Sequence, residues 1–312
     1  MIYVEMAGRC GNQLFHYSIA RYVQLVTGDK LCLNFNHIFD KKAPEKGYID
    51  YLKDFNVADY QYYNRPGNIL KNESSFTQKI LIGLKGIQLY CEKNKSRQYK
   101  ANKAQFGEKI LNFSGVYWVR EGVTDITPFK RKKSLVSGVC ETSLIYKIQD
   151  TLQKEIVPKK TVSPKNLELI KQIDNSNSVC VSVRRGDFFS KQNKKSFGVC
   201  TPNYYIKAKK FFDDRNIDNT MFFCFSDDIE WCKENLNFEG ANVVYVSQDM
   251  PVYETLRLMY HCKHFILSNS TFSWWGQFLS KNNNKIVVSP SRWNNDGYDS
   301  NLISKDWVLI DD

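Results

Sequence analysis

Residues 179–187 read VCVSVRRGD, a short apolar run that ends at two arginines, a glycine and an aspartate. Its β-branched composition predicts a strand buried on both faces, as strands of parallel sheets are. Similar apolar runs recur toward the C-terminus, at residues 221–225, 243–246, 265–267 and 286–288. Helical patterns lie between them, at residues 202–212, 229–236, 251–260 and 272–279. Strands that alternate with helices in this way predict an α/β domain with a doubly wound parallel sheet.

The N-terminal residues predict a second unit of the same kind. Residues 2–6 and 31–35 are apolar enough for strands, and apolar side chains between them recur as on one face of a helix. Gly28 stands where that helix would end in a left-handed conformation. The turn before the helix reads GRCGNQLF, at residues 8–15. It holds more glycine and amide groups than a turn needs, which predicts a ligand loop.

The chain has 312 residues, a length suited to two domains. Residues 40–160 mix polar and aromatic side chains without a clear period, so we expect helices and loops there. Residues 159–165, KKTVSPK, predict a linker. We therefore expect an N-terminal domain at residues 1–160 and a C-terminal domain at residues 161–312.

The formal net charge of +11 predicts an anionic partner, such as a nucleotide, a nucleic acid or an acidic membrane surface. The nine cysteines are scattered without a CxxC pair, which indicates free thiols in a reducing cytoplasm. The first residues show no signal-peptide pattern, and no apolar stretch approaches the roughly 18 residues of a membrane span. We expect a cytoplasmic protein, peripheral at the inner face of the membrane if it binds lipid.

Residues with binding chemistry follow three of the predicted strands, at the edge where parallel sheets bind ligands. Arg184 and Arg185 follow the first strand, Asp227 follows the second, and residues 268–273, SNSTFS, lead from the third into a helix. Helix N-termini and arginine forks bind phosphate oxygens, and a carboxylate can accept two hydrogen bonds from guanine. This edge therefore predicts a nucleoside diphosphate site. The chain has no lysine-bearing phosphate loop, so we do not expect hydrolysis of a nucleoside triphosphate.

Each of these features has a plainer interpretation as well. The arginine pair could be a surface ion pair, and residues 268–271 could be only a helix cap. Residues 226–228 could likewise cap the helix that holds Trp231. A basic nucleic-acid-binding protein is a further alternative, based on the charge and the 14% aromatic content, although no nucleic-acid motif is recognisable.

Six blocks of the sequence resemble the α-1,2-fucosyltransferases of glycosyltransferase family 11. They are GRCGNQLFHYSIAR, VSVRRGDF, CTPNYY, FFCFSDDIEWCKENL, MYHCKHFILSNSTFSWWGQFL and VVSPSRW, in that order. The GRxGNQ loop is also similar to that of protein O-fucosyltransferases. The resemblance implies a GT-B-like α/β fold of two Rossmann-like domains that face a central cleft. It also implies GDP-fucose as donor, a terminal galactoside as acceptor, inversion at the anomeric carbon, and no metal or other cofactor.

The resemblance implies roles for residues that match these blocks. Arg184 would hold the β-phosphate of the donor, and Arg185 would support it or contact phosphate itself. Asp227 would read guanine. The other residues implied to bind the donor are Asn12 and Gln13 in the first domain and Ser270, Thr271, Phe272 and Ser273 in the second.

The chain departs from the family at two places. Ser182 stands where the family usually has a histidine, and the block VYWVREGVT, at residues 116–124, is a degenerate form of the family's GYxQSEKYF. Within this block, Trp118 and Glu121 would lie on the acceptor side. The general base stays unassigned, with Glu121 and Asp187 as candidates, and we expect His16 to be a packing residue.

Two alternatives stay open within this fold, a transferase for another nucleotide sugar and an inactive sugar-binding relative. Lysine-rich runs at residues 93–103 and 130–133 lie outside the predicted nucleotide site. They predict peripheral contact with an anionic membrane. Because family members commonly act on lipid-linked oligosaccharides, we expect a role in lipopolysaccharide or other surface polysaccharide biosynthesis, with no nucleic-acid partner.

Overall fold

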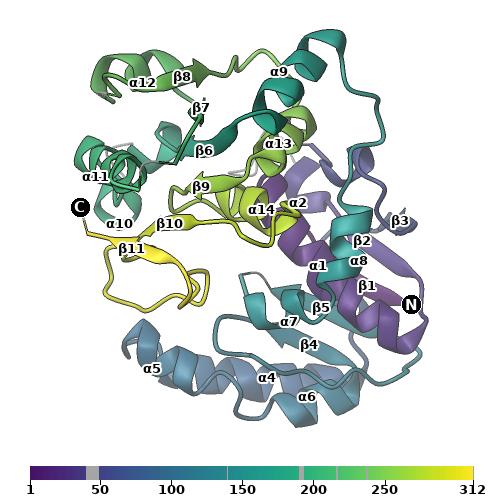
Figure 1. Ribbon diagram of the computed structural model, residues 1–312. Coiled ribbons are helices and arrows are strands. Elements are labelled where there is room, and N and C mark those ends of the chain that lie inside the picture. Colours follow the sequence, from purple (N-terminus) through teal and green to yellow (C-terminus); the bar gives the residue numbers. More distant parts are fainter. Residues whose placement is uncertain (40–48, 139, 190–192, 216, 237, 312) are drawn as a thin grey trace. The chain divides into compact units, whose positions relative to one another are not determined.

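The structure is a computed structural model that describes residues 1–39, 49–138, 140–189, 193–215, 217–236 and 238–311. It divides into two compact units, Met1–Val157 and Pro158–Asp312. The division falls three residues before the predicted boundary at residue 160. Each unit is built on its own parallel sheet (Figure 1).

The first unit contains a five-stranded sheet in the order β3-β2-β1-β5-β4. Its strands are β1 (Ile2–Glu5), β2 (Leu31–Asn34), β3 (Tyr60–Tyr62), β4 (Val116–Val119) and β5 (Ser134–Gly138). Its helices are α1 (Cys10–Thr27), α2 (Asn36–Phe39), α3 (Ile69–Glu73), α4 (Phe76–Cys91), α5 (Arg97–Asn102), α6 (Glu108–Ser114), α7 (Thr142–Tyr146) and α8 (Gln149–Glu155), with a 3₁₀ turn at Leu52–Asp54. All the strand pairs are parallel.

The predicted strand–helix–strand start of the chain is confirmed by β1, α1 and β2. Gly28 ends α1 in the left-handed conformation, with φ at 72°, as predicted. The expectation of only helices and loops at residues 40–160 is wrong, because β3, β4 and β5 lie there. These strands have three to five residues each, too few to show a period among the polar and aromatic side chains around them. Residues 40–48 and 139 of that stretch lie outside the described residues.

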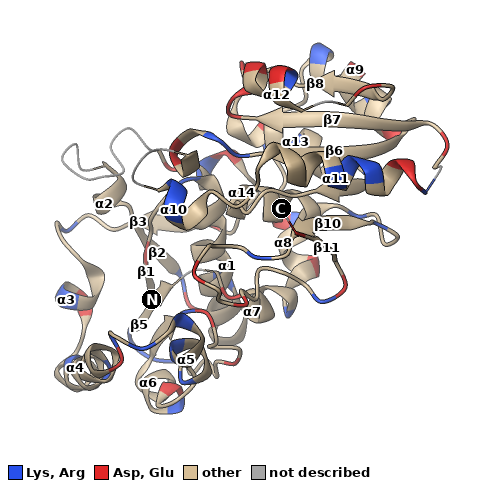
Figure 2. Ribbon diagram, turned by 90° about the vertical axis from the view of Figure 1, so that its left-hand side faces the viewer, with Lys and Arg blue, Asp and Glu red and all other residues tan. Residues whose placement is uncertain are grey.

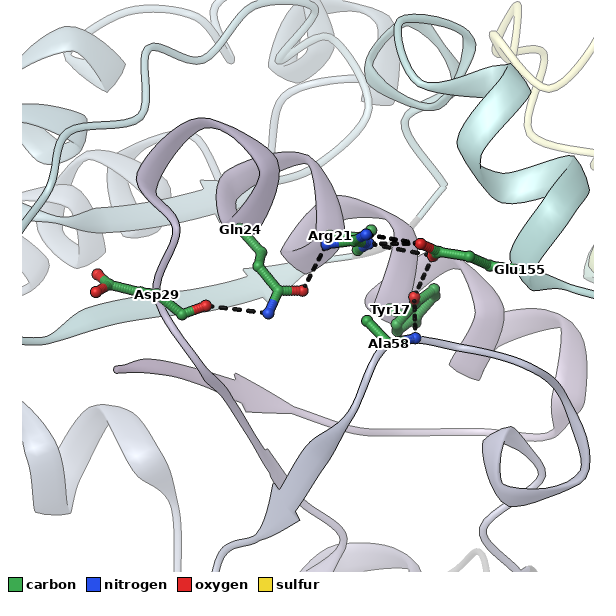
Figure 3. Close-up of polar contacts among 6 residues, drawn as sticks. All are labelled: Tyr17, Arg21, Gln24, Asp29, Ala58 and Glu155. Carbon is green, nitrogen blue, oxygen red and sulfur yellow. Dashed lines mark hydrogen bonds and ion pairs between the residues drawn. The ribbon is translucent and has the colours of Figure 1, made fainter.

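An ion pair and hydrogen bonds link α8 to α1 in the first unit (Figure 3). Glu155 accepts hydrogen bonds from Arg21, with 2.7 Å between Nη2 and Oε1, and from the hydroxyl of Tyr17. The same hydroxyl accepts from the backbone N–H of Ala58 at 2.9 Å. Burial and the Glu155 carboxylate raise the pKa of Tyr17, so its hydroxyl keeps the proton that it donates. These contacts hold α8, the last helix before the boundary between the units, against α1.

The second unit contains a six-stranded sheet in the order β11-β10-β9-β6-β7-β8. Its strands are β6 (Asn177–Val183), β7 (Thr220–Ser226), β8 (Asn242–Tyr245), β9 (His264–Ile266), β10 (Val287–Pro290) and β11 (Val308–Ile310). Its helices are α9 (Pro164–Asp174), α10 (Lys194–Phe197), α11 (Pro202–Asp213), α12 (Ile229–Asn235), α13 (Val252–His261) and α14 (Thr271–Leu279), with a 3₁₀ turn at Gly186–Phe189. Counted from β6, the order is 3-2-1-4-5-6, which is that of dinucleotide-binding folds.

Both faces of this sheet are buried, which explains why its strands read as continuous apolar runs. Val179, Val181 and Val183 of β6 point to the core on one face, which α11 and α12 cover. Cys180 points to the core on the other face, which α9 and α13 cover (Figure 1). The structure contains the five strands and four helices predicted here, with ends that differ by one or two residues. The sequence analysis missed the edge strand β11.

The predicted α/β class is confirmed, because each unit carries the parallel sheet of a Rossmann-like domain. The facing arrangement of the two domains stays a prediction. Among the described residues, no helix is both long and apolar enough to cross a membrane.

Candidate active site

The centre of the candidate site lies where β6 and β7 end side by side. Because Val183 pairs with Ser226 in the parallel register, the next residues, Arg184 and Asp227, leave their strands at the same level. Nη1 of Arg184 lies 2.8 Å from Oδ2 of Asp227. The other oxygen, Oδ1, accepts the backbone N–H of Arg185 at 2.8 Å. One carboxylate therefore holds both the guanidinium of Arg184 and the backbone that follows it.

Gly186 makes this close approach possible. A Cβ at position 186 would lie 2.6 Å from Oδ2 of Asp227, closer than nonbonded atoms can stand. Any larger residue would push Asp227 away from Arg184. The sequence analysis missed this role, although the glycine stands inside the RRGD block.

A second carboxylate, that of Asp187, contacts the other end of the same guanidinium. Nη2 of Arg184 donates a hydrogen bond to Oδ1 of Asp187, which comes from the 3₁₀ turn after β6. The Arg184 side chain is 20% exposed, against 43% for Asp187 and 26% for Asp227. Arg184 is thus a mostly buried cation between two carboxylates, and Asp187 is the partner more open to solvent.

Arg185 makes a different kind of contact. Its guanidinium lies over the ring of Trp231 on α12, 3.8 Å from the centroid, and over the ring of Phe189, at 4.1 Å. Cation–π contacts of this kind hold a guanidinium flat without a carboxylate partner. The Nε atom of Arg185 is buried and has no hydrogen-bond partner. Its predicted contact with phosphate stays a prediction.

The loop between β9 and α14 supplies the third side of the site. Asn269 is buried and donates to the carbonyl oxygens of Phe197, at 3.0 Å, and Trp293, at 2.9 Å, which fixes the loop. Ser270 is the N-cap of α14, and its side chain makes no capping hydrogen bond. Helix N-terminal N–H groups carry a partial positive charge. Since β9 is the neighbour of β6, this helix begins beside the strand that carries Arg184.

The four predicted donor residues at this helix start differ in their surroundings. Ser270 and Thr271 are partly exposed, as a ligand contact requires. Phe272 packs partly against the core between the sheet and α13. Ser273 is fully buried, and its Oγ accepts the backbone N–H of Ser268 at 3.2 Å. In this structure Ser273 shapes the loop, and its predicted contact with the donor stays a prediction.

In the first unit, Gln13 is committed to the backbone around it. It is fully buried, donates to the carbonyl oxygens of Gly8 and Ile49, and accepts the N–H of Tyr51 at 2.9 Å. Gly8 has φ at 72°, and a Cβ there would lie 2.5 Å from Nδ2 of Asn12. The glycine of the GRCG loop therefore lets the backbone pass close to Asn12. The predicted donor contacts of Asn12 and Gln13 stay predictions.

Trp118 and Glu121 lie on β4 and in the loop after it. Trp118 is partly exposed, and Glu121 is 10% exposed and forms an ion pair with Arg97 of α5.

His16 is buried on α1, and burial lowers its pKa to about 4. Its Nδ1 has no hydrogen-bond partner, which agrees with a neutral ring packed in the interior.

The structure thus brings Arg184, Asp187 and Asp227 into direct contact, and it places Arg185 and the start of α14 next to them. Asn12, Gln13, Trp118 and Glu121 belong to the other unit. Ser182, in the position of the family histidine, is buried on β6, and its carbonyl oxygen accepts from the hydroxyl of Tyr205. Among the described residues, no group of three or more His, Cys, Asp and Glu side chains is arranged to hold a metal ion.

Comparison with known proteins identifies the class and the family. Residues 130–311 match the family model described as glycosyl transferase family 11. The chain belongs to glycosyltransferase family 11, because the match covers more than half of its length, and the resemblance stated from the sequence blocks is confirmed.

Individual relatives match shorter stretches. The chain is 39% identical over 129 residues to an alpha-1,2-colitosyltransferase of Escherichia coli, covering 40% of this chain and 44% of that protein. It is 33% identical over 150 residues to the O-antigen biosynthesis glycosyltransferase WbnK of Escherichia coli, covering 46% and 49%. It is 30% identical over 105 residues to human galactoside alpha-(1,2)-fucosyltransferase 1, covering 33% and 28%. The chain spans about half or less of the length of these relatives.

Among solved structures, the chain is similar to NodZ alpha-1,6-fucosyltransferase soaked with GDP-fucose. That alignment has a TM-score of 0.48 at 11% identity and covers 95% of this chain and 96% of the other.

Proposed function

We propose that the chain transfers L-fucose from GDP-fucose to the 2-hydroxyl of a terminal β-galactoside, with inversion and without an essential metal ion. Membership of family 11 supports this reaction, and so do the α-1,2 linkages in the names of two of its relatives. The name of the third relative supports an O-antigen or similar surface polysaccharide as the product. The absence of an Asp-x-Asp sequence supports catalysis without a metal.

The observation that carries the proposal is the Arg184 cluster at the carboxyl end of β6. A guanidinium binds two oxygens of a phosphate as it binds those of a carboxylate. Arg184 is already oriented by Asp227, and its second partner, Asp187, is the more exposed of the two. In the proposed complex the β-phosphate takes the place of Asp187 at Nη2. Asp227 remains the support on the other side and accepts hydrogen bonds from guanine.

In the proposed reaction, the bond between fucose C1 and the β-phosphate oxygen breaks while galactose O2 attacks from the opposite face. Negative charge then grows on the departing GDP. Arg184 and the N-terminal N–H groups of α14 would stabilise this charge without a large rearrangement. The positive charge of Arg184 would do for the diphosphate what a divalent ion does in metal-dependent transferases.

The acceptor side rests on Trp118 and Glu121 of the first unit. Glu121 is paired with Arg97, and Asp187 is paired with Arg184, so both candidate bases are already engaged by an arginine. A dissociative transition state needs less help from a base, because the acceptor proton leaves late. The proposal therefore leaves the base unassigned.

A second candidate donor sugar is colitose, because the relative with 39% identity is named a colitosyltransferase. Colitosyl transfer would use the same diphosphate and guanine contacts and differ only in the pocket for the sugar. Purified protein should be given GDP-fucose, GDP-colitose and UDP-galactose in turn, each with a panel of β-galactosides. Linkage analysis of the product by NMR identifies the acceptor hydroxyl.

We expect transfer from GDP-fucose to the 2-hydroxyl of galactose. Transfer from GDP-colitose alone would identify colitose, the second candidate, as the donor sugar instead of fucose. Transfer from UDP-galactose, or to another hydroxyl, would contradict the proposal.

A further inference from the structure

Helix α4 carries an exposed apolar stripe along its full length. Five large apolar side chains recur every three or four residues on its outer face, so they line up on one side. They are Phe76, Ile80, Leu84, Ile87 and Tyr90, and their exposed fractions run from 49% to 80%. A helix on the surface of a globular protein normally turns such a stripe inward.

The neighbouring helix α6 repeats this arrangement. It packs against α4, and Ile110 and Phe113 on α6 and Phe106 just before it are each more than 60% exposed. We call these three side chains, together with the five on α4, the α4–α6 face. Eight large apolar side chains exposed on and beside two packed helices exceed the scattered exposure of ordinary surface and indicate an interaction site.

The inner sides of the two helices contain polar groups that water would have solvated. Lys85 of α4 and Glu108 of α6 form a buried ion pair, with 2.7 Å between Nζ and Oε1. Gln78 is buried as well and donates to the carbonyl oxygen of Ser114 at 2.9 Å. Because burying such groups costs free energy, their place inside while apolar groups lie outside indicates that the outer face meets an apolar partner.

The exposed charges between residues 74 and 120 are all positive. Between residues 74 and 120 the only acidic residues are Glu92 and Glu108, and both are buried. The basic residues of this segment outside the buried pair are Lys79, Lys93, Lys95, Arg97, Lys100, Lys103, Lys109 and Arg120. Two of them form ion pairs, Arg97 with Glu121 and Arg120 with Glu92. Figure 2 shows α4, α5 and α6 together at one end of the first unit, with blue bands on α5.

Arg131 belongs to the basic run at residues 130–133 and contacts an apolar side chain of this face. Its guanidinium lies 4.5 Å from the ring centroid of Phe113 and also lies over Phe129. Lys130 and Lys132 are exposed beside it. Lys133 differs from these two lysines, because it pairs with the buried carboxylate of Glu73 at 2.7 Å.

We propose that the α4–α6 face binds the surface of an anionic lipid bilayer, with its apolar side chains among the lipid headgroups and its lysines on phosphates. Amphipathic helices with an apolar stripe and basic flanks lie in the membrane interface in this way. A second copy of the chain fits less well, since two such faces would bring like charges together. The inference is independent of the proposed reaction, because no residue of the face belongs to the candidate active site.

The apolar stripe separates this mode of binding from adsorption by charge alone. Lysine–lipid attraction contributes about 1 kcal/mol per residue and is screened by salt. Insertion of apolar side chains is not screened. Binding should therefore need anionic lipid at low salt but persist in part at about 0.5 M salt, where the Debye length falls to roughly 4 Å.

The test is sedimentation of the full chain with vesicles of phosphatidylcholine, with and without phosphatidylglycerol. The variant Leu84→Gln/Ile87→Gln removes the middle of the stripe without changing charge or buried contacts. Its matched control is Leu167→Gln/Ile206→Gln, two exposed apolar residues of the second unit. We expect the wild type and the control to bind anionic vesicles equally, and the stripe variant to bind roughly tenfold more weakly.

Cys91, at the exposed end of α4, offers a direct readout. It is exposed, whereas seven of the nine cysteines are buried and Cys140 is partly buried. Burial raises the pKa of the Cys140 thiol to about 12, which suppresses labelling there. An environment-sensitive maleimide dye on Cys91 should shift to shorter emission wavelength with anionic vesicles and not with phosphatidylcholine alone.

Three results would overturn the inference. The first is failure of the wild type to bind anionic vesicles, and the second is equal binding by the stripe variant. The third is a protein that does not bind vesicles but forms a concentration-dependent dimer in sedimentation velocity, with the dimer abolished in the stripe variant. That result would assign the face to contact between copies of the chain.

Discussion

Arg184 and Asp227 leave neighbouring strands at the same level and pair there, with 2.8 Å between Nη1 and Oδ2. The pair depends on the register of β6 with β7 and on the missing side chain of Gly186. Both features belong to the folded second unit. The protein itself therefore orients the guanidinium, which in the proposed reaction would lower the reorganisation needed in the transition state.

The first prediction concerns the geometry of Arg184. Arg184→Lys keeps the positive charge but loses the planar fork that contacts Asp187 and Asp227 from its two ends. Loss of one contact to the departing diphosphate should cost roughly 3–4 kcal/mol, a factor of about 10²–10³ in turnover. The measurement is kcat for fucosyl transfer at saturating GDP-fucose.

The matched control is Arg215→Lys. Arg215 follows α11 at the opposite edge of the sheet, and its guanidinium lies over the ring of Phe211. This control should keep wild-type turnover. Near-normal turnover of Arg184→Lys would show that the fork does not stabilise the leaving group.

The second prediction separates two roles of Asp227. Asp227→Asn replaces one acceptor oxygen by a donor amide. If the carboxylate reads guanine, the preference for GDP over UDP and ADP should shrink by about 1–3 kcal/mol, because a buried polar pair is mismatched. Competition binding of the three nucleotides measures this preference. Weaker binding of all three by the same factor would limit Asp227 to holding Arg184 and the N–H of Arg185.

The third prediction is that transfer survives metal removal. In the proposed reaction, Arg184 and the start of α14 supply the positive charge that the leaving diphosphate needs, and the sequence has no Asp-x-Asp pair to hold an ion. Initial rates measured after dialysis against excess EDTA should equal those of untreated enzyme. A loss of activity that Mn²⁺ or Mg²⁺ restores by titration would contradict this mechanism.

The second unit could be predicted from sequence because its sheet is buried on both faces. Strands such as β6 and β7 then become unbroken apolar runs, and the polar residues just after them must meet at one edge. The edge strands β3 and β11 give no such signal, whereas β8, also at an edge, is apolar enough to show one. Tyr60–Tyr62 and Val308–Ile310 have three residues each, and most of their side chains are partly or fully exposed.

The chemistry of the site could be predicted as a set of residues but not as a set of contacts. The sequence predicts that Arg184 and Asp227 follow two strands of one sheet, whereas only coordinates show that Asp187 also contacts Arg184 or that Arg185 stacks on Trp231. Side-chain rotamers and loop paths decide these contacts. Gln13 is the clearest example, since a motif residue implied to bind the donor has its amide bonded to Gly8, Ile49 and Tyr51.

The fourth prediction is a loss of stability in acid that depends on His16. Burial lowers the pKa of His16 to about 4, from 6.5 for an exposed histidine. Between these values the unfolded chain binds a proton that the folded chain excludes, so the free energy of unfolding falls as the pH falls. From pH 7 to pH 5, protonation of His16 in the unfolded chain should lower the free energy of unfolding by about 2 kcal/mol, because one pKa unit corresponds to roughly 1.4 kcal/mol.

Urea unfolding at several values between pH 5 and pH 7 measures this loss. His16→Gln cannot take up a proton, so its free energy of unfolding should fall by about 2 kcal/mol less than that of the wild type over the same range. The comparison uses the slope with pH, so a uniform loss of stability from the buried glutamine does not affect it. Parallel profiles for the wild type and His16→Gln would mean that His16 is not held neutral in the folded chain.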